Sequence, residues 1–503
     1  MATSSATRPV LLVFLVASRA SSDRPVTLPG VTDPTARGTR TSGLDLHLGP
    51  ISETGRNVRA SLMDAFREAI RTGRLAPGSR LPPSRVLATD LGLGRNTVVR
   101  VYSELINEGW LTALHGSGTE VSRRSSELPS GWSRPRPPAA RPRWVHDLRP
   151  GFPDLSSFPR DEWVRAVKRT VTTSPFEAFG YIDPHGRGEL RDAVARYLAR
   201  ARGVHAHADN VIVCSGAAQG LRLVAAVLVN AGVTKVAIEE FCLHTQRPAL
   251  LKAGIEPVLL PVDADGADTS VLDDMPDVGA VLLTPSHQFP LGVALQSDRR
   301  AAVVDWARRR GALIIEDDYD GEFRYDRSPV GALQGLDHDR VIYMGTASKS
   351  LAPGLRLGWL VVPDRLVGPI VAEKGWAEDS VGFVNQLAMA DFIDSGAYDR
   401  HIRAMRTRYR RRREQLIETV NRQSPATRIV GMSAGLQVLL EHPSRTGAEL
   451  VRRATREQLA VESLDFFRNP DSTSDRDGLV VGFAAPSPSA WTGSLDALIR
   501  TLR

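Results

Sequence analysis

Residues 344–358 read MGTASKSLAPGLRLG, and they contain one of only five lysines in a chain of 503 residues. This lysine, Lys349, directly follows Ser348, and Arg356 comes soon after it. Upstream, residues 314–319 read IIEDDY, an apolar run that ends in acidic residues and a tyrosine. The two stretches together offer an amine, hydroxyl groups, a guanidinium and a carboxylate. The amine can bind a phosphorylated aromatic aldehyde covalently, and the other groups can hold it by hydrogen bonds and charge.

Pyridoxal 5′-phosphate (PLP) is the cofactor that needs this set. Its aldehyde forms an imine with an amine, which we assign to Lys349. A carboxylate must keep its pyridine nitrogen protonated, which we assign to Asp317. Tyr319 is expected to hydrogen-bond the ring hydroxyl, and Ser348 and Arg356 to hold the phosphate. The alternative is a chance Ser-Lys pair in a loop beside a solvated acidic turn, and the ordered set of groups argues against it.

Apolar runs around these stretches indicate the fold of the large domain. From residue 148 onward, short apolar runs alternate with amphipathic helices; examples lie at 211–214, 236–238, 280–283, 312–315 and 341–344. This alternation predicts an α/β fold with a mostly parallel sheet, whose strand ends carry ligand sites. Gly216, Ala217 and Ala218 follow one such run and open a helix, where backbone N–H groups can cradle a phosphate. Alone, these small residues would indicate only a tight turn.

The amino-terminal part predicts a second, smaller domain. Helical periodicity covers residues 57–72, 85–91 and 95–108, and strands are expected at 110–113 and 119–121. Ser84 is the expected N-cap of the second helix. Three helices followed by a two-stranded wing predict a winged helix-turn-helix, whose third helix would enter the major groove of DNA.

Several residues of this module are suited to DNA. Arginine and asparagine can read guanine and adenine bidentately, and a helix start suits a phosphate. The candidate DNA-binding residues are Ser84, Arg85, Arg95, Asn96, Thr97, Arg100 and, at the tip of the wing, Gly116 and Ser117. Residues 51–124 contain 11 Arg, no Lys and 7 Asp or Glu, a net charge of +4. The alternative is an ordinary helical domain with solvated arginines.

Composition limits the remaining possibilities. The formal net charge of +7 permits an anionic partner. Two cysteines make neither a disulfide scaffold nor a zinc site, so we expect no metal and a reducing cytoplasm. The apolar run at 10–17 is too short to span a bilayer and only faintly resembles a secretion signal.

We expect residues 1–43 to be disordered or to precede the true start, 44–124 to bind DNA, 125–147 to form a Pro/Arg-rich linker, and 148–503 to form the large domain.

These motifs resemble known families. LPPSR at 81–85, RNTVVRVY at 95–102 and GSGT at 116–119 resemble GntR-type winged-helix regulators. TPSHQFP at 284–290 and EDDYDGEFRY at 316–325 are similar to the regulatory branch of fold-type I PLP aminotransferases. Joined in one chain, they resemble the MocR/GabR family of transcriptional regulators.

The resemblance adds expectations about single residues. It supports the PLP roles given above and implies that His287 approaches the cofactor and that Tyr181 lies at the mouth of the site. Two positions depart from the family. Leu243 stands where an aromatic residue usually stacks on the PLP ring, unless Phe241 or His244 takes that place. Val480 replaces the arginine that binds a substrate carboxylate, and Arg476 is the nearest arginine in the sequence.

The resemblance implies a homodimeric, PLP-dependent regulator that binds a double-stranded DNA operator. Its aminotransferase-like domain would sense a small amine or amino acid, or PLP itself. An active aminotransferase with a DNA-binding appendage is the alternative, and Val480 counts against it.

Overall fold

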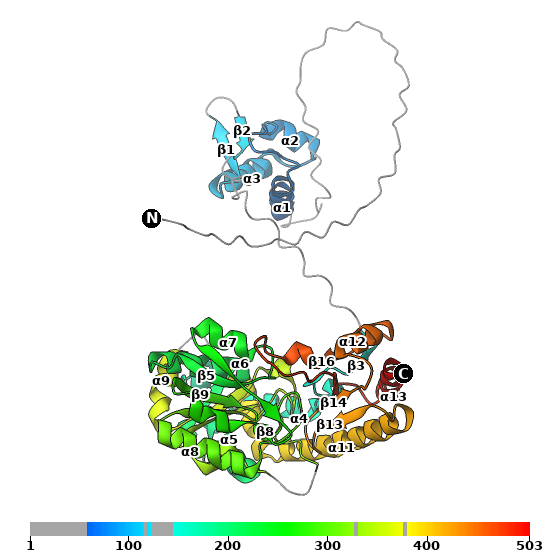
Figure 1. Cartoon of the computed structure of the whole chain (residues 1–503). Coiled ribbons are helices and arrows are strands. Elements are labelled where there is room, and N and C mark those ends of the chain that lie inside the picture. Colours follow the sequence, from blue (N-terminus) through cyan, green and yellow to red (C-terminus); the bar gives the residue numbers. More distant parts are fainter. Residues whose placement is uncertain (1–57, 115–117, 123–143, 326–329, 376–379) are drawn as a thin grey trace, which may run out of the picture. The chain divides into compact units, whose positions relative to one another are not determined.

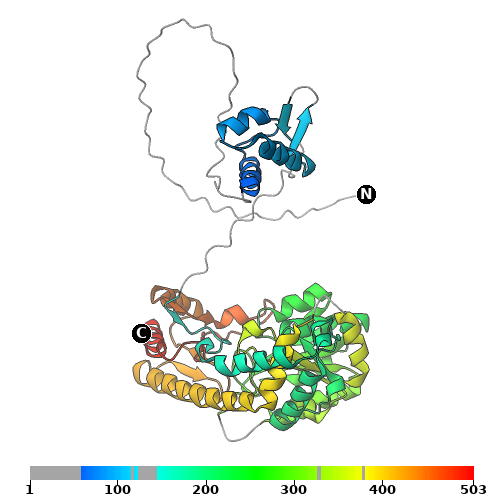
Figure 2. The same ribbon diagram turned by 180° about the vertical axis from the view of Figure 1, so that it is seen from behind.

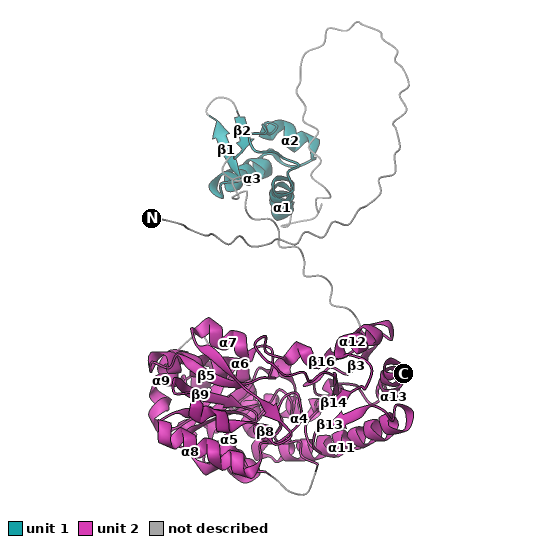
Figure 3. Ribbon diagram, viewed as in Figure 1, with its two compact units in different colours: residues 1–141 teal, residues 142–503 magenta. Residues whose placement is uncertain are grey.

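The structure, a computed structural model, describes residues 58–114, 118–122, 144–325, 330–375 and 380–503 (Figure 1). Gly116, Ser117, the expected amino-terminal extension and most of the expected linker lie outside these residues. The chain divides into unit 1, residues 1–141, and unit 2, residues 142–503 (Figure 3). Within the described ranges, no helix has the length and apolar character needed to cross a bilayer.

Unit 1 is the predicted winged helix-turn-helix. Its elements are α1 (Val58–Arg71), α2 (Ser84–Asp90), α3 (Arg95–Asn107), β1 (Leu111–Leu114) and β2 (Gly118–Val121). Apolar side chains at helical spacing, among them Phe66, Val98 and Leu105, are fully buried together in one small core. Strands β1 and β2 pair antiparallel and form the wing. The prediction of Ser84 as an N-cap was wrong: the helix already includes Ser84, and Pro83 occupies the cap position.

The main sheet of unit 2 has seven strands. Its order is β4 (Val211–Cys214), β12 (Gly358–Val361), β11 (Val341–Thr346), β10 (Leu313–Asp317), β9 (Val278–Leu283), β5 (Lys235–Glu239) and β6 (Glu256–Leu260). Only β12 runs antiparallel to its neighbours, so the predicted mostly parallel sheet is confirmed. The carboxyl ends of β10 and β11 therefore meet at one edge of the sheet.

Helices cover both faces of this sheet, because its strands are apolar on both sides. In β4, Ile212 packs into a core with α6 (Ala217–Asn230), α7 (Gln246–Ala253) and α9 (Asp364–Lys374). Its neighbours Val211 and Val213 face another core, which includes α4 (Arg160–Thr173), α5 (Gly188–Arg202) and α10 (Phe383–Asp394). Helix α8 (Ser297–Arg310) packs in a further core with β9 and β10.

A second, antiparallel sheet completes unit 2. Its order is β13 (Arg428–Val430), β14 (Gln437–Glu441), β17 (Leu479–Gly482) and β16 (Glu462–Ser463). With it lie α12 (Gly447–Arg456), α13 (Trp491–Leu502) and the long α11 (Ala397–Gln423), the yellow-to-orange helix along the lower edge of the unit (Figure 1 and Figure 2). Two short pairs remain, β3 (His146–Asp147) with β15 (Leu459–Ala460) and β7 (Val262–Asp263) with β8 (Gly266–Ala267). Strand β3 thus ties two residues of the expected linker into unit 2.

Candidate cofactor site and nucleic-acid interface

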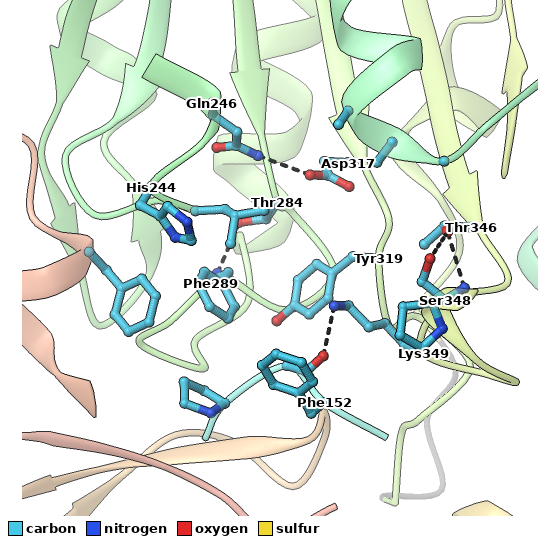
Figure 4. Close-up of a pocket in the computed structure, with 18 of the residues that line it drawn as sticks. Phe152, His244, Gln246, Thr284, Phe289, Asp317, Tyr319, Thr346, Ser348 and Lys349 are labelled. Atoms are coloured by element: carbon cyan, nitrogen blue, oxygen red, sulfur yellow. Dashed lines mark hydrogen bonds between the residues drawn. The ribbon is translucent and has the colours of Figure 1, made fainter. Parts of the chain in front are cut away.

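A cavity of about 430 Å³ lies at the carboxyl edge of the main sheet, and its size suits a small cofactor. It is lined by nine of the residues that the sequence predicted as cofactor neighbours: Gly216, Ala217, Ala218, Leu243, Asp317, Tyr319, Ser348, Lys349 and Arg356. Figure 4 shows how Asp317, Tyr319, Ser348 and Lys349 converge from the ends of β10 and β11. Residues far apart in the sequence therefore line one cavity.

Lys349 is the amine of this cavity. It follows β11 in a turn, and its Nζ donates a hydrogen bond of 2.7 Å to the carbonyl oxygen of Gly151. Burial lowers the pKa of Lys349, while the charges of Asp317 and Asp320 oppose that shift. A lysine whose pKa is lowered in this way is a better nucleophile at neutral pH.

Asp317 is the last residue of β10 and is buried. Its Oδ2 accepts a hydrogen bond of 2.9 Å from Nε2 of Gln246. Burial raises the pKa of Asp317 to about 7, and the nearby Lys349 opposes the shift. A buried carboxylate with no full ion pair favours a positive charge beside it. The protonated pyridine nitrogen of PLP meets that requirement.

Tyr319 has its hydroxyl held by two side chains. Its Oη accepts a hydrogen bond of 2.8 Å from Nε2 of Gln437 and lies 2.9 Å from Nδ1 of His287. The same nitrogen of His287 lies 2.9 Å from Oδ2 of Asp320. His287 is buried and is not part of the cavity wall. His287 thus contacts the hydroxyl of Tyr319, and its predicted approach to the cofactor would be through Tyr319.

The phosphate end combines a helix start with a guanidinium. Gly216 immediately precedes α6 and has φ +103°, a conformation that favours glycine. A Cβ at Gly216 would lie 3.6 Å from Nη1 of Arg356, so the guanidinium is close to this helix start. Arg356 has no carboxylate partner within the described residues. Oγ1 of Thr346 donates 2.8 Å to Oγ of Ser348. Free helix N–H groups, a hydroxyl and an unpaired cation suit a phosphate.

Of the two aromatic residues that could replace Leu243 on the face of the PLP ring, only one lines the cavity. Leu243 lines the cavity, with 38% of its surface exposed. Phe241, one of the two aromatic alternatives, is fully buried beneath the guanidinium of Arg468 and does not line the cavity. His244 does line it, and its ring centroid lies 4.9 Å from that of Phe466.

The far end of the cavity lacks a free arginine among the described residues. Val480 is fully buried. Nη2 of Arg476 lies 3.2 Å from Oε1 of Glu441, and Arg476 is absent from the cavity wall. Several residues that line the cavity were not predicted from the sequence: Arg149, Gly151, Phe152, Glu462, Phe466 and Phe467. They come from segments just after the linker and near the carboxyl end, and no local motif connects them with Lys349.

Unit 1 presents a surface suited to DNA at the starts of α2 and α3. Arg85, Arg95, Asn96 and Arg100 are exposed there, and Ser84 and Thr97 are half-buried. None of these three arginines has an ion-pair partner within the described residues. On α1, by contrast, Arg59 lies 3.2 Å from Glu104 and Arg67 lies 2.6 Å from Glu108. Three cations without an ion pair thus lie where the helix-turn-helix would meet phosphates.

Known proteins match both units. Residues 59–121 match the GntR family of bacterial regulatory proteins, and residues 150–472 match aminotransferase class I and II. The chain is 34% identical to a probable rhizopine catabolism regulatory protein, MocR, of Rhizobium meliloti, over 88% of this chain and 93% of that one. It is 31% identical to the pyridoxine biosynthesis transcriptional regulator PdxR of Corynebacterium glutamicum, over 79% and 85% of the two chains.

Among solved structures, unit 2 is similar to PLP aminotransferases. An archaeal alanine:glyoxylate aminotransferase superposes with a TM-score of 0.64 and 22% identity, over 71% of this chain and 90% of that one. A Pyrococcus horikoshii kynurenine aminotransferase gives a TM-score of 0.63 with the same identity and coverage. These similarities show the fold of unit 2, and the family matches show to which family the whole chain belongs. The chain belongs to the MocR family of transcriptional regulators, in which a GntR-type DNA-binding domain is joined to a PLP-binding domain of aminotransferase class I and II.

Proposed function

We propose that Lys349, Asp317, Tyr319, Ser348 and Arg356 hold PLP in the cavity of unit 2, and that the occupancy of this cavity sets the DNA affinity of unit 1. The observation that carries the proposal is the pairing of Lys349 with Asp317 in one cavity. Lys349 has a lowered pKa and Asp317 a raised one, both because of burial. Two groups so shifted within one cavity are typical of a functional site.

Each residue has a distinct task in this arrangement. When bound, PLP supplies an aldehyde carbon that is reactive toward primary amines. Lys349 provides the amine that attaches it, and Asp317 keeps a positive charge at the far side of the ring. Tyr319 offers its hydroxyl to the ring oxygen. Ser348 and Arg356, with the N–H groups of residues 216–218, hold the phosphate. Leu243 packs on the ring.

DNA recognition is assigned to unit 1. Arg95 and Asn96, at the start of α3, would read base edges in the major groove. Thr97 and, one turn on, Arg100 would lie at the base edges beside them. Ser84 and Arg85 would hold phosphates, which fix the register of the protein on the duplex. Gly116 and Ser117 keep their predicted role at the wing tip. Because its target is chromosomal DNA, we expect the protein to act in the cytoplasm.

A homodimer fits the exposed aromatic surface of unit 2. Phe176 and Tyr181 are 94% and 92% exposed, and Phe179 is 52% exposed. So much exposed aromatic surface is unusual in a monomer and indicates a contact surface. A second copy would cover it, and two-fold symmetry would require an operator with paired half-sites.

The effector is a small amine or amino acid that reaches PLP, or PLP itself. The effector can change DNA binding only if the protein has two arrangements that differ in DNA affinity and if the effector binds them with unequal affinities. The lowered pKa of Lys349 also suits a general base. Residual transaminase activity is therefore a second candidate.

The visible spectrum of the protein with PLP tests the cofactor assignment. We expect an absorption band on the wild type that borohydride reduction fixes to Lys349, as peptide mapping would show. Lys349→Ala should lose the fixed cofactor, while Lys168→Ala, at an exposed position on α4, should keep it. Equal labelling of Lys349→Ala and wild type would refute the assignment.

A further inference from the structure

One wall of the cavity carries side chains that have no role in the proposed binding of PLP. Glu462 lies on this wall, together with Arg149, Phe152, Phe466 and Phe467. Glu462 is on β16 and stands in register with Val480 on β17, so that their side chains share one face of the small sheet. An acidic side chain thus neighbours the position that the family resemblance gives to a carboxylate-binding arginine.

Glu462 on this wall and Asp147, which pairs with Arg149, give two negative charges against the one positive charge of Arg149. Glu462 is half-buried and accepts no hydrogen bond from any described side chain. Burial raises the pKa of Glu462, and Arg149 opposes the shift. Arg149 is already neutralised, because its Nε and Nη2 donate 3.0 and 2.6 Å hydrogen bonds to the two carboxylate oxygens of Asp147. One carboxylate charge, that of Glu462, is left without a direct partner.

Aromatic rings surround the same space. The rings of Phe289 and Phe467 have centroids 5.0 Å apart, and those of Phe466 and Phe467 are 5.1 Å apart. Phe152 also lines the cavity, near Tyr319 (Figure 4), and the guanidinium of Arg149 already lies over its ring, 4.8 Å from the centroid. Aromatic faces attract cations, most strongly where water is excluded, and a carboxylate among them strengthens the attraction.

We propose that Glu462 and these phenylalanines bind a positively charged group at the non-reacting end of the effector. The preferred effectors would then be diamines, with one amine directed at PLP and a second ammonium at Glu462. An amino acid would place its carboxylate against Glu462, and like charges at close range oppose binding. The inference rests on the proposed function, since it takes PLP to be attached to Lys349.

Three ligands with the same four-carbon chain test this proposal. They are 1,4-diaminobutane, n-butylamine and 4-aminobutanoate, whose distal groups are cationic, neutral and anionic. Their affinities for the PLP-loaded protein are measured by calorimetry at pH 8. We expect wild type to prefer the diamine to the monoamine at least roughly tenfold and to bind the amino acid most weakly.

Variants at position 462 separate charge from shape. Glu462→Gln should reduce the preference for the diamine to less than about threefold and leave butylamine affinity unchanged, and Glu462→Arg should favour 4-aminobutanoate. Asp465→Asn, an exposed position three residues further along the chain, is the control and should behave like wild type.

The outcomes separate the two proposals. The PLP absorption band is recorded for each protein before titration, and its absence from wild type would overturn the cofactor assignment and this inference with it. With the band present, the inference alone is overturned if wild type binds 4-aminobutanoate as tightly as the diamine, if it binds none of the three ligands, or if Glu462→Gln keeps the preference.

Discussion

In unit 1 the arginines and the asparagine assigned to DNA are exposed, whereas in unit 2 Asp317 is buried and Lys349 is half-buried. Arg85, Arg95 and Asn96 project from exposed helix surfaces, and nothing described in the structure pairs with the two arginines. Lys349 and Asp317 meet at strand ends, where burial shifts the pKa of each. Exposed cations act through charge that salt screens, while buried groups act through desolvation and fixed hydrogen bonds. Substitutions should therefore have different consequences in the two units.

The largest expected effect is at Asp317. Asp317→Asn removes the charge that balances the protonated ring nitrogen, and breaking a buried pair costs about 3–5 kcal/mol. We expect PLP affinity to fall roughly hundredfold or more, measured by equilibrium titration of the absorption band. DNA binding by the unloaded protein should not change. Asp263→Asn, outside the cavity, should retain wild-type affinity, and an unchanged affinity in Asp317→Asn would contradict the assigned role.

A smaller effect is expected at the start of α3. Arg95→Ala should weaken binding to a selected operator by about 1–3 kcal/mol, roughly ten- to hundredfold, because a base contact is lost. PLP binding should be unaffected, since Arg95 lies in unit 1. Electrophoretic mobility shifts with DNA selected from random sequences measure the change. Arg59→Ala is the control, because the side chain of Arg59 on α1 is paired with Glu104. Loss of PLP binding in folded Arg95→Ala would break the division between the two units.

The pH dependence of stability distinguishes the buried carboxylate from an exposed one. The folded-state pKa of Asp317 is raised from 3.8 to about 7, so between these values the folded protein holds a proton that the unfolded chain has released. Stability of the PLP-free protein therefore falls as pH rises through this range. Asp317→Asn escapes this loss. Its melting temperature should gain on that of wild type between pH 5 and 8.

Asp263→Asn provides the matched comparison. The pKa of Asp263 is lowered by its hydrogen bond with Arg299, so this carboxyl stays ionised in both states above pH 5. Its melting difference from wild type should be flat over the same range. If Asp317→Asn shows the same flat difference, the raised pKa of Asp317 is refuted.

The smallest effect is expected for a phosphate contact. Arg85→Ala should weaken DNA binding about equally for all sequences. It should also reduce the slope of log affinity against log salt by about one. Titrations at several salt concentrations with operator and unrelated DNA measure both quantities. A sequence-dependent loss would instead place Arg85 at a base edge.

The comparison also explains which features could be predicted from the sequence. Lys349, Asp317 and Tyr319 lie in local motifs next to apolar strands, so their convergence follows from the rule that parallel strand ends meet at one edge. The exposed positions of Arg95 and Asn96 at the start of α3 could be predicted for a similar reason, because three helices and a wing form one compact local unit.

Glu462, Phe152 and Gln246 escaped prediction, because each enters the cavity through tertiary packing alone. Glu462 lies on a strand of only two residues, which is too short for a pattern of alternating apolar residues to predict it. Gln246 opens α7 and reaches Asp317 from a distant part of the chain. His287, which was predicted beside the cofactor, contacts Tyr319 and does not line the cavity, because sequence proximity to a motif does not fix the direction of a side chain.

DNA affinity measured with the cavity in different states tests whether the cavity of unit 2 controls the DNA binding of unit 1. Wild type and Lys349→Ala are titrated onto the same selected operator at fixed salt, each without PLP, with PLP, and with PLP and 1,4-diaminobutane. We expect wild type to change its operator affinity between at least two of these states and Lys349→Ala to give one affinity in all three. Identical affinities for wild type in every state would contradict the claim that the cavity of unit 2 controls the DNA binding of unit 1.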